Sequence, residues 1–305
     1  MLRREYRAAN GRILFTAREA DVWAEIGPGV SVRRGHLLHA LQESCGAATI
    51  RRGRRVVAAR QLAGRVEVIF EGDEAPECYD FVVAADGVGS TLRPLVSTGR
   101  VRRSVMTESC WRFVVDDPGV ACWTAWTGRV GTVLLIPVEP GWVYGYAASS
   151  LGHGTGSDPG WLVRTFAGFP APVVRAVLGA SAGEGELHHG AVQEVQLPRW
   201  HRGRLVLVGD AAHATGPVWA QGAAMALEDA LVLARLLAQH EDWSTVGAAL
   251  ERIRRPRVDH VRAATDRMSR LARWPSRLRD LAAPALGPRA FRQAYGPLRA
   301  EFDPG

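Results

Sequence analysis

The chain has 305 residues, of which 47% are hydrophobic and 23% are charged, which is enough for a sizeable core in one large or two ordinary domains. No apolar run is long enough to cross a membrane, and the N-terminus lacks the apolar region of a secretory signal. We therefore expect a cytoplasmic protein without a transmembrane segment. The 4 cysteines stand far apart and form no C-x-x-C pair, which argues against a disulfide framework or a zinc site.

All 38 basic residues are arginine, and the formal net charge is +7. The densest basic stretch covers residues 251–279. A nucleic-acid surface is one interpretation of this stretch. We favour a solvated helical face, because neither an aromatic stacking platform nor a DNA-binding motif accompanies the charge, and we expect no nucleic-acid partner.

Helix-like and strand-like stretches alternate over the first third of the chain. Leucines at helical spacing predict an amphipathic helix within residues 31–45. The apolar run 79–84 (YDFVVA) has the character of a buried parallel strand, and Asp86 and Gly87 follow it. Further short strands are predicted at residues 47–50, 55–59 and 65–71.

Strand-like runs separated by glycine or proline dominate residues 103–197, as in an antiparallel meander. The helical stretch 161–178 contains Pro170 and Pro172, and we expect it to form two pieces. Many of the tryptophans lie in or beside this segment, so we expect a broad apolar sheet that forms the roof of a substrate site. Strands are predicted at residues 105–115, 121–127, 131–137, 142–148 and 188–196.

The last third is predicted to be one strand followed by helices. The run 205–208 (LVLV) reads as a second buried strand. Strong helix formers predict a long helix over residues 222–240, and its apolar residues cover most faces, so the helix should be buried. The remainder is predicted to be helical and interrupted by Pro256 and Pro275.

The strongest chemical signal lies in residues 202–237. A buried strand carries Asp210 to the carboxyl edge of a sheet, where ligands bind in open α/β folds. Pro217 makes a rigid turn, and the long helix then opens at Gly222. The first amides of a helix have no helical partner and lie at its positive dipole end, so they suit an anionic or electron-rich group.

This stretch resembles the second flavin motif of FAD-dependent monooxygenases of the para-hydroxybenzoate hydroxylase type, in which G-D-A-A-H is followed by P-x-x-x-Q-G and a helix. The resemblance implies that Asp210 binds the ribityl hydroxyls and that Pro217 borders the flavin ring. The family usually has glycine where this chain has Ala220, which affects flavin geometry if that position needs a positive φ. The resemblance also places the pyrimidine edge of the ring against the backbone of Gly222, Ala223 and Ala224.

Two shorter stretches match the same family. Asp86 and Gly87 match the motif that supports the flavin pyrophosphate and the nicotinamide cofactor; an N-cap or turn carboxylate is the alternative role of Asp86. Arg34, in R-G-H-L-L-H-A-L, matches the arginine of an R-x-x-L helix start that touches the phosphate-ribose portion; a plain surface arginine is the alternative. For His213 we expect a structural hydrogen bond rather than a catalytic role, and we expect no metal site.

The resemblance implies a mixed α/β fold. A Rossmann-like FAD-binding domain would cover residues 1–102, an antiparallel-sheet substrate domain 103–197, and a return to the FAD-binding domain with C-terminal helices 198–305. The implied cofactors are FAD and NAD(P)H, and the implied reaction is hydroxylation or epoxidation of a small hydrophobic or aromatic substrate through a flavin hydroperoxide. No catalytic acid or base can be assigned, and the sequence leaves a homodimer open.

The family's opening βαβ unit, with its G-x-G-x-x-G turn, has no counterpart in this sequence, so we expect an incomplete FAD-binding domain. Three explanations stay open. The start is set too far downstream or the gene is a fragment; the chain is a flavin-free ligand-binding protein or non-redox cyclase; or a partner chain supplies the missing unit.

Overall fold

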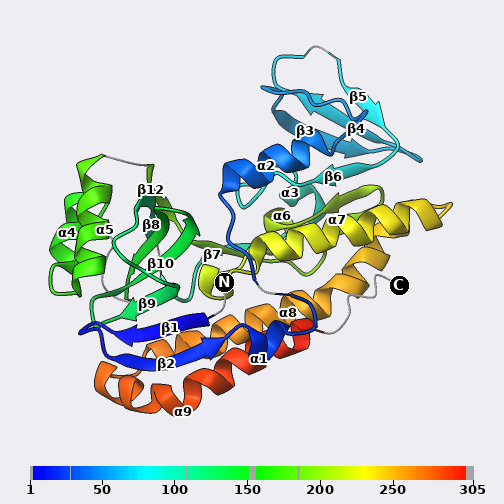
Figure 1. Cartoon of the computed structure of the whole chain (residues 1–305). Coiled ribbons are helices and arrows are strands. Elements are labelled where there is room, and N and C mark those ends of the chain that lie inside the picture. The colour runs from blue at the N-terminus through cyan, green and yellow to red at the C-terminus, as the bar shows by residue number, and fades with distance from the viewer. Residues whose placement is uncertain are drawn as a thin grey trace. The chain divides into compact units, whose positions relative to one another are not determined.

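The computed structural model describes residues 3–27, 29–73, 75–107, 109–150, 156–183 and 186–299. The chain divides into two compact units, and Figure 1 labels most of their helices and strands. The first unit comprises Met1–Ala48, Val105–Val192 and Asp266–Ala300, and the second comprises Thr49–Ser104, Gln193–Thr265 and Glu301–Gly305. The segments Met1–Ala48 and Asp266–Ala300 therefore pack with the middle segment Val105–Val192. The limits 1–102, 103–197 and 198–305 as functional domains stay a prediction.

A seven-stranded sheet dominates the first unit. Its order is β12-β8-β11-β10-β9-β1-β2, and all neighbours are antiparallel except β1 and β9. The antiparallel meander predicted from the sequence is thus present, and an N-terminal hairpin extends it. The strands are β1 (Arg3–Ala8), β2 (Ile13–Arg18), β8 (Ser109–Asp116), β9 (Trp123–Thr127), β10 (Gly131–Glu139), β11 (Trp142–Ser149) and β12 (Leu187–Ala191).

One face of this sheet packs against helices α4 (Gly160–Phe166) and α5 (Ala171–Ala182), which lie side by side in Figure 1. The two-piece helix predicted here is confirmed, with Pro170 as the N-cap of α5. The core between the sheet and the helices contains Trp111 and Trp126, so these two side chains lie on the helix-covered face, and the sheet as the roof of a substrate site stays a prediction. Because side chains alternate along a strand, the opposite face carries other residues: Cys110, Arg112, Tyr144 and Tyr146.

The terminal segments of the first unit meet around Arg4. Its guanidinium donates to the Glu19 carboxylate at 2.5 Å and to the Tyr295 hydroxyl at 2.7 Å. These contacts tie β1 to the start of α1 (Ala20–Trp23) and to the end of α9 (Ser276–Tyr295), which η2 (Gly296–Arg299) follows.

The predicted N-terminal helix is confirmed as α2 (Arg34–Glu43). The amphipathic pattern predicts that one face of this helix packs against a core, and this part of the prediction is wrong. No α2 side chain is buried, and Leu38 and Leu41 are 52% and 44% exposed. The preceding Arg33 pairs with Glu139 and lies over the Trp142 ring. These polar and cation–π contacts connect α2 to the sheet.

The second unit contains three small sheets, ordered β14-β15-β6, β3-β4-β5 and β13-β7. Strands β6 and β15 are parallel, and the other pairs are antiparallel. The strands are β3 (Val56–Gln61), β4 (Val66–Phe70), β5 (Glu77–Tyr79), β6 (Val82–Ala84), β7 (Arg100–Arg103), β13 (Gln193–Gln196), β14 (His201–Arg202) and β15 (Leu205–Leu207). The helices are α3 (Arg93–Val96), α6 (Asp210–His213), η1 (Pro217–Trp219), α7 (Gly222–Gln239) and α8 (Val246–Ala272), which continues into the first unit.

The core of the second unit lies between β15, α7 and α8. Val206, Val232 and Leu250 belong to it, each with at most 1% of its surface exposed. The prediction that α7 is buried holds for one face only, because Leu227 and Leu231 are 42% and 65% exposed. One face of α7 meets the core and the opposite apolar face meets solvent within the described chain.

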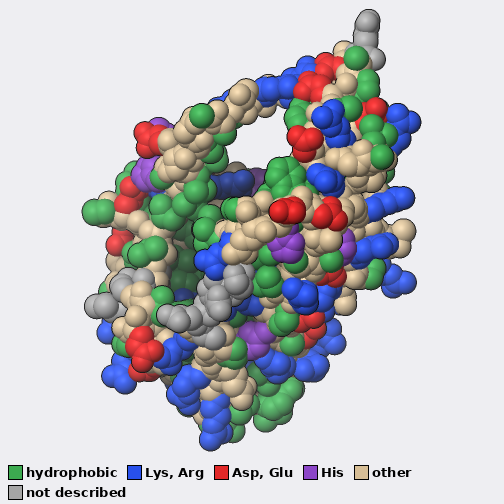
Figure 2. Space-filling model, turned by 90° about the vertical axis from the view of Figure 1, so that its right-hand side faces the viewer, with side chains coloured by type: hydrophobic (Ala, Val, Ile, Leu, Met, Phe, Trp, Pro, Cys, Tyr) green, Lys and Arg blue, Asp and Glu red, His purple; other side chains and the backbone are tan. Residues whose placement is uncertain are grey.

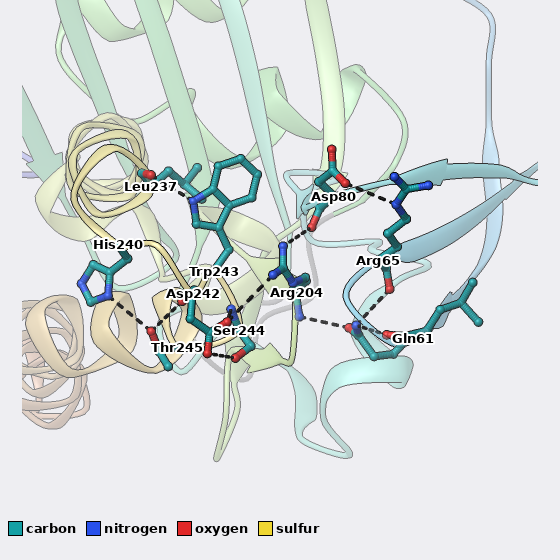
Figure 3. A network of polar contacts seen from close by, with 11 residues as sticks. Gln61, Arg65, Asp80, Arg204, Leu237, His240, Asp242, Trp243, Ser244 and Thr245 are labelled. Carbon is teal, nitrogen blue, oxygen red and sulfur yellow. Dashed lines mark hydrogen bonds and ion pairs between the residues drawn. The ribbon is translucent and has the colours of Figure 1, made fainter.

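A polar network fixes the β3–β4 hairpin to the β14–β15 turn and to the α7–α8 connection (Figure 3). The Arg204 amide donates to the Gln61 side-chain oxygen at 3.0 Å, and its guanidinium donates to the Asp80 carbonyl at 3.2 Å. Asp242 lies 3.9 Å from the same guanidinium. Trp243 donates its indole N–H to the Leu237 carbonyl at 3.0 Å.

Several predicted elements differ from the structure. No strand forms at 47–50, the run 79–84 divides between β5 and β6, and the run 188–196 divides between β12 and β13 in different sheets. Pro256 lies inside α8 and does not end it, because apolar and ionic packing on both sides outweighs the cost of about 3 kcal/mol for an internal proline. Pro275 does separate two helices, as the N-cap of α9.

Among the described residues, no helix combines the length and apolar character that crossing a bilayer requires. On the face drawn in Figure 2, arginine side chains lie in several areas and are interspersed with acidic ones. In α8, Arg254 and Arg257 both pair with Glu228, and Arg255 pairs with Glu251. Arg254 is 0% exposed, so the expected solvated face does not include it, whereas Arg255 and Arg257 are partly exposed. The absence of a nucleic-acid partner stays a prediction.

Candidate functional site

Two parallel strands end side by side in the second unit. β6 pairs with β15 in the register Val82↔Leu205, and Asp86 and Asp210 follow these strands at the same edge. This confirms the predicted arrangement of two buried strands that carry acidic residues to one sheet edge.

Gly209 makes the turn at the end of β15. Its φ of 55° and ψ of −138° suit glycine, and a Cβ there would lie 3.1 Å from the Cβ of Ala226. The turn directs the Asp210 side chain to solvent, and no residue of the described chain pairs with its carboxylate. Asp210 is therefore available to accept hydrogen bonds from a ligand.

The opening of α7 lies beside that carboxylate. A Cβ added to Gly222 would lie 3.9 Å from Oδ1 of Asp210. The first intrahelical bond seen at this end runs from the Met225 amide to the Gln221 carbonyl at 2.9 Å, so the preceding amides have no helical acceptor. No side chain caps this end, and Ala223 and Ala224 are exposed. The predicted pairing of a carboxylate with a free helix end is thus present.

The segment between Asp210 and α7 contains a strained residue. Pro217 is exposed and begins η1, and Ala220 follows with a φ of 53°. Ala220 is the one non-glycine residue with a positive φ in the described ranges. The family's usual glycine at this position therefore has a conformational reason, and alanine costs about 1–2 kcal/mol there.

A buried ionic cluster holds the Gly209 turn in place. The Asp229 carboxylate accepts the Gly209 amide at 2.9 Å, His213 Nε2 lies 2.6 Å from it, and Arg254 Nε donates to it at 2.8 Å. Asp229 and Arg254 are 1% and 0% exposed, and His213 is 3% exposed. Burial alone would raise the pKa of Asp229, but the bonds from His213 and Arg254 hold the pKa below its ordinary value.

This cluster shows the role of His213 and adds two residues. The structural hydrogen bond predicted for His213 is confirmed by its contact with Asp229. Asp229 and Arg254 were missed, although a carboxylate in phase with Met225, Val232 and Leu236 on the buried face of a helix was a signal for them.

Arg93 joins the two strand ends and is a third residue that the sequence prediction left out of the site. Its guanidinium donates to the carbonyls of Ala211 and Val88 at 2.8 Å and of Gly87 at 2.9 Å. Burial lowers its pKa from the ordinary value. The side chain therefore holds the loop after β6 against the loop after β15.

Asp86 has a local role in the structure. Its carboxylate accepts the amide of Thr91 at 2.9 Å and that of Leu92 at 3.3 Å, just before α3. This is the turn carboxylate that the sequence offered as the alternative. Gly87 has a φ of 77° and open space where a Cβ would be. A cofactor role for Asp86 and Gly87 stays a prediction.

Arg34 is the first residue of α2 in the first unit and is exposed. No residue of the described chain pairs with its guanidinium. Its predicted place beside the ligand of the second unit stays a prediction. Within the described ranges no group of three or more His, Cys, Asp or Glu side chains is arranged to hold a metal ion.

Comparisons with known proteins define the class. The chain is 32% identical over 263 residues to 2-heptyl-3-hydroxy-4(1H)-quinolone synthase of Pseudomonas aeruginosa, covering 81% of this chain and 66% of the relative. It is 31% identical over 240 residues to the FAD-dependent urate hydroxylase of Klebsiella pneumoniae, covering 76% of this chain and 61% of the relative. The chain therefore spans less than two thirds of the length of these two relatives.

A solved structure shows the same fold. Klebsiella pneumoniae HpxO in complex with FAD and uric acid matches 99% of this chain and 77% of its own, with a TM-score of 0.77 and 26% identity. The chain is thus similar to FAD-dependent hydroxylases, which also include the salicylate hydroxylase of Pseudomonas putida at 29% identity. Residues 33–268 match the model of the FAD binding domain, and the chain belongs to that family, whose cofactor is FAD.

The residues of the second unit fit that cofactor. An exposed carboxylate at Asp210 can accept bonds from the hydroxyls of a sugar alcohol, and the free amides at the start of α7 can donate to an electron-rich ring edge. Small residues at Ala223 and Ala224 leave the backbone open to a flat ligand.

Proposed function

We propose that the protein is an FAD- and NAD(P)H-dependent monooxygenase that hydroxylates or epoxidises a small aromatic or hydrophobic substrate. The observation that carries the proposal is the placement of the Asp210 carboxylate beside the uncapped start of α7. When bound, FAD supplies the redox and oxygen chemistry.

In this proposal, the chain's own residues bind and orient the FAD. Asp210 accepts hydrogen bonds from the ribityl hydroxyls, and Pro217 borders the flavin ring. The backbone amides of Gly222, Ala223 and Ala224 donate hydrogen bonds to the pyrimidine edge of that ring. The positive end of the α7 dipole stabilises negative charge at that edge by about 0.3–1 kcal/mol when exposed and about 2 kcal/mol when partly buried. Arg34 pairs with the phosphate-ribose portion, and Asp86 and Gly87 support the pyrophosphate region. The predictions of a cytoplasmic location and a homodimer stay predictions.

The test combines cofactor, reductant and oxygen. Purified protein loaded with FAD should oxidise NADH or NADPH in the presence of an aromatic substrate, consume oxygen, and give a product heavier by one oxygen atom in mass spectrometry. Label from ¹⁸O₂ should enter that product. Turnover of a ligand under anaerobic, flavin-free conditions would instead support a flavin-free binding protein or cyclase and contradict the proposal.

A further inference from the structure

Arg112 lies on β8, next to the edge strand β12 of the first unit's sheet, on the face away from α4 and α5. The β8–β11 ladder sets it directly opposite Tyr146, and the β8–β12 ladder sets it opposite His188. Tyr144 lies two residues along β11 from Tyr146 and so shares the same face. The Arg112 side chain is partly buried.

The charge of Arg112 has no counter-charge in the described part of the chain. The groups that interact with it are Cys110, Tyr144 and Tyr146, and none of its ladder neighbours is acidic. Cys110 is 1% exposed, and burial raises the pKa of its thiol. Burial also raises the pKa of both phenols, so all three groups are neutral at neutral pH.

A charged arginine in these surroundings costs folding free energy unless an anionic group pairs with it. Taking a charge out of water is unfavourable, so partly buried charges in proteins are paired with a counter-charge or with a ligand. The planar guanidinium presents its N–H groups in a fork that matches two oxygens, and tyrosine hydroxyls beside it add donors. The sheet holds the set rigidly, as a binding site requires.

We propose that Arg112 is a substrate-binding residue that receives an anionic oxygen of the substrate, with Tyr144 and Tyr146 beside it. The inference rests on the proposed function and narrows its substrate class to compounds that carry a carboxylate, phenolate or enolate. Arg112 binds and orients this group, and the tyrosine hydroxyls donate to the same oxygen or to its neighbour.

A purely structural role for Arg112 makes a different prediction. If the guanidinium only bridges Cys110 and Tyr146, its removal lowers stability but leaves ligand preference unchanged. The distinguishing readout is therefore the difference in affinity between an anion and its neutral match, which a structural role does not move.

Benzoate is the probe, and benzamide is the neutral compound of the same shape. Titrations of the whole chain are followed by NMR through the arginine Nε–H resonances, for wild type, Arg112→Met and Arg112→Lys. Arg129→Met is the matched control, because Arg129 is an exposed arginine in the same unit. In wild type, benzoate should shift the Arg112 resonance saturably and bind at least about tenfold more tightly than benzamide, the effect of one charge-assisted hydrogen bond.

The Arg112→Met variant should lose this preference and Arg129→Met should keep it. If Arg112→Met does not fold, Arg112→Lys replaces it as the test variant, because lysine keeps the positive charge but loses the two-pronged guanidinium geometry. The Arg112→Lys variant should bind benzoate more weakly than wild type does and should still prefer benzoate over benzamide. Equal affinity for the two compounds in wild type, absence of benzoate binding, or an unchanged preference in Arg112→Met overturns the inference.

FAD binding is measured on the same samples by flavin absorbance. Bound FAD without a benzoate preference contradicts the role of Arg112 and leaves the proposed function standing. A benzoate preference that depends on Arg112, found in protein that does not bind FAD, supports the role of Arg112 in anion binding and contradicts the proposed function.

Discussion

Asp229 is the residue on which the candidate site depends most for its shape. One buried carboxylate holds the Gly209 turn, His213 and Arg254 together. The sequence motif identifies the turn and His213, but the partner of His213 lies 16 residues further on in α7. Only the fold places the two together, so local pattern alone does not predict the cluster.

We expect Asp229→Asn to lower the free energy of unfolding by about 1.5–3 kcal/mol at neutral pH, because the change removes the charge-assisted bond to the buried Arg254, which keeps its pair with Glu228. The native pKa of Asp229 is depressed, so its contribution to stability is complete above the unfolded pKa of about 3.9 and is lost as the pH falls through the native pKa. The difference between wild type and variant should therefore shrink below about pH 4.

Urea unfolding curves recorded across pH measure this difference. Asp158→Asn is the control, because Asp158 pairs with Arg164 at the exposed surface and should matter little. A difference between wild type and Asp229→Asn that stays constant from pH 7 to strong acid would contradict the role assigned to the ionised carboxylate.

Ala220 stores backbone strain next to the candidate site. Relief of its left-handed conformation in Ala220→Gly outweighs the extra unfolded-chain entropy of glycine, so we expect unfolding free energy to rise by up to about 1 kcal/mol. Ala234→Gly, in the exposed middle of α7, should lower it by about 1 kcal/mol. Thermal and urea unfolding of both variants give the signs, and a destabilising Ala220→Gly would be inconsistent with strain.

At the scale of elements, strands and helices are predicted best from the sequence where the hydrophobic pattern and the turn residues indicate the same boundary. The strands before Asp86 and Asp210 and the helix after Gln221 were all located, because apolar runs end there at glycine-containing turns. The run 188–196 was assigned to one strand, since its division between two sheets depends on long-range pairing with β8 and β7. The exposed face of α7 was missed, because an apolar helix pattern does not say which faces find a partner.

The connection between β6 and β15 depends on Arg93 as well as on the ladder. The Val82 amide donates to the Arg204 carbonyl at 2.9 Å, and the Val208 amide donates to the Ala84 carbonyl at 3.1 Å. Arg93→Met removes the donors that join the two loops beyond these bonds, so the strand ends should separate more often.

Amide hydrogen exchange measures this opening at Val208 and Val82. Exchange at Val208 should speed up at least about tenfold in Arg93→Met, which corresponds to about 1.4 kcal/mol. Arg202→Met removes an exposed arginine of the same unit that donates to the Leu95 carbonyl, and it should leave the exchange near the wild-type rate. Unchanged protection in Arg93→Met would show that the ladder holds without Arg93.

At the scale of the whole molecule, the two units contain different residues of the proposed function. The second unit brings together Asp210, the start of α7 and the cluster beneath them, and the first unit presents Arg112 on a rigid sheet. The family resemblance seen in the sequence is confirmed by the domain match over residues 33–268. Arg34 and the residues of the second unit remain linked only by prediction.

The most direct test of the central claim is the affinity of the protein for FAD with and without the Asp210 carboxylate. Titration by flavin fluorescence should show binding by wild type and at least about tenfold weaker binding by Asp210→Asn, because charge-assisted bonds to the ribityl hydroxyls are lost. Asp80→Asn, a change at another exposed aspartate of the same unit, should bind like wild type. Equal affinity of wild type and Asp210→Asn, or no binding of FAD by wild type, would contradict the account.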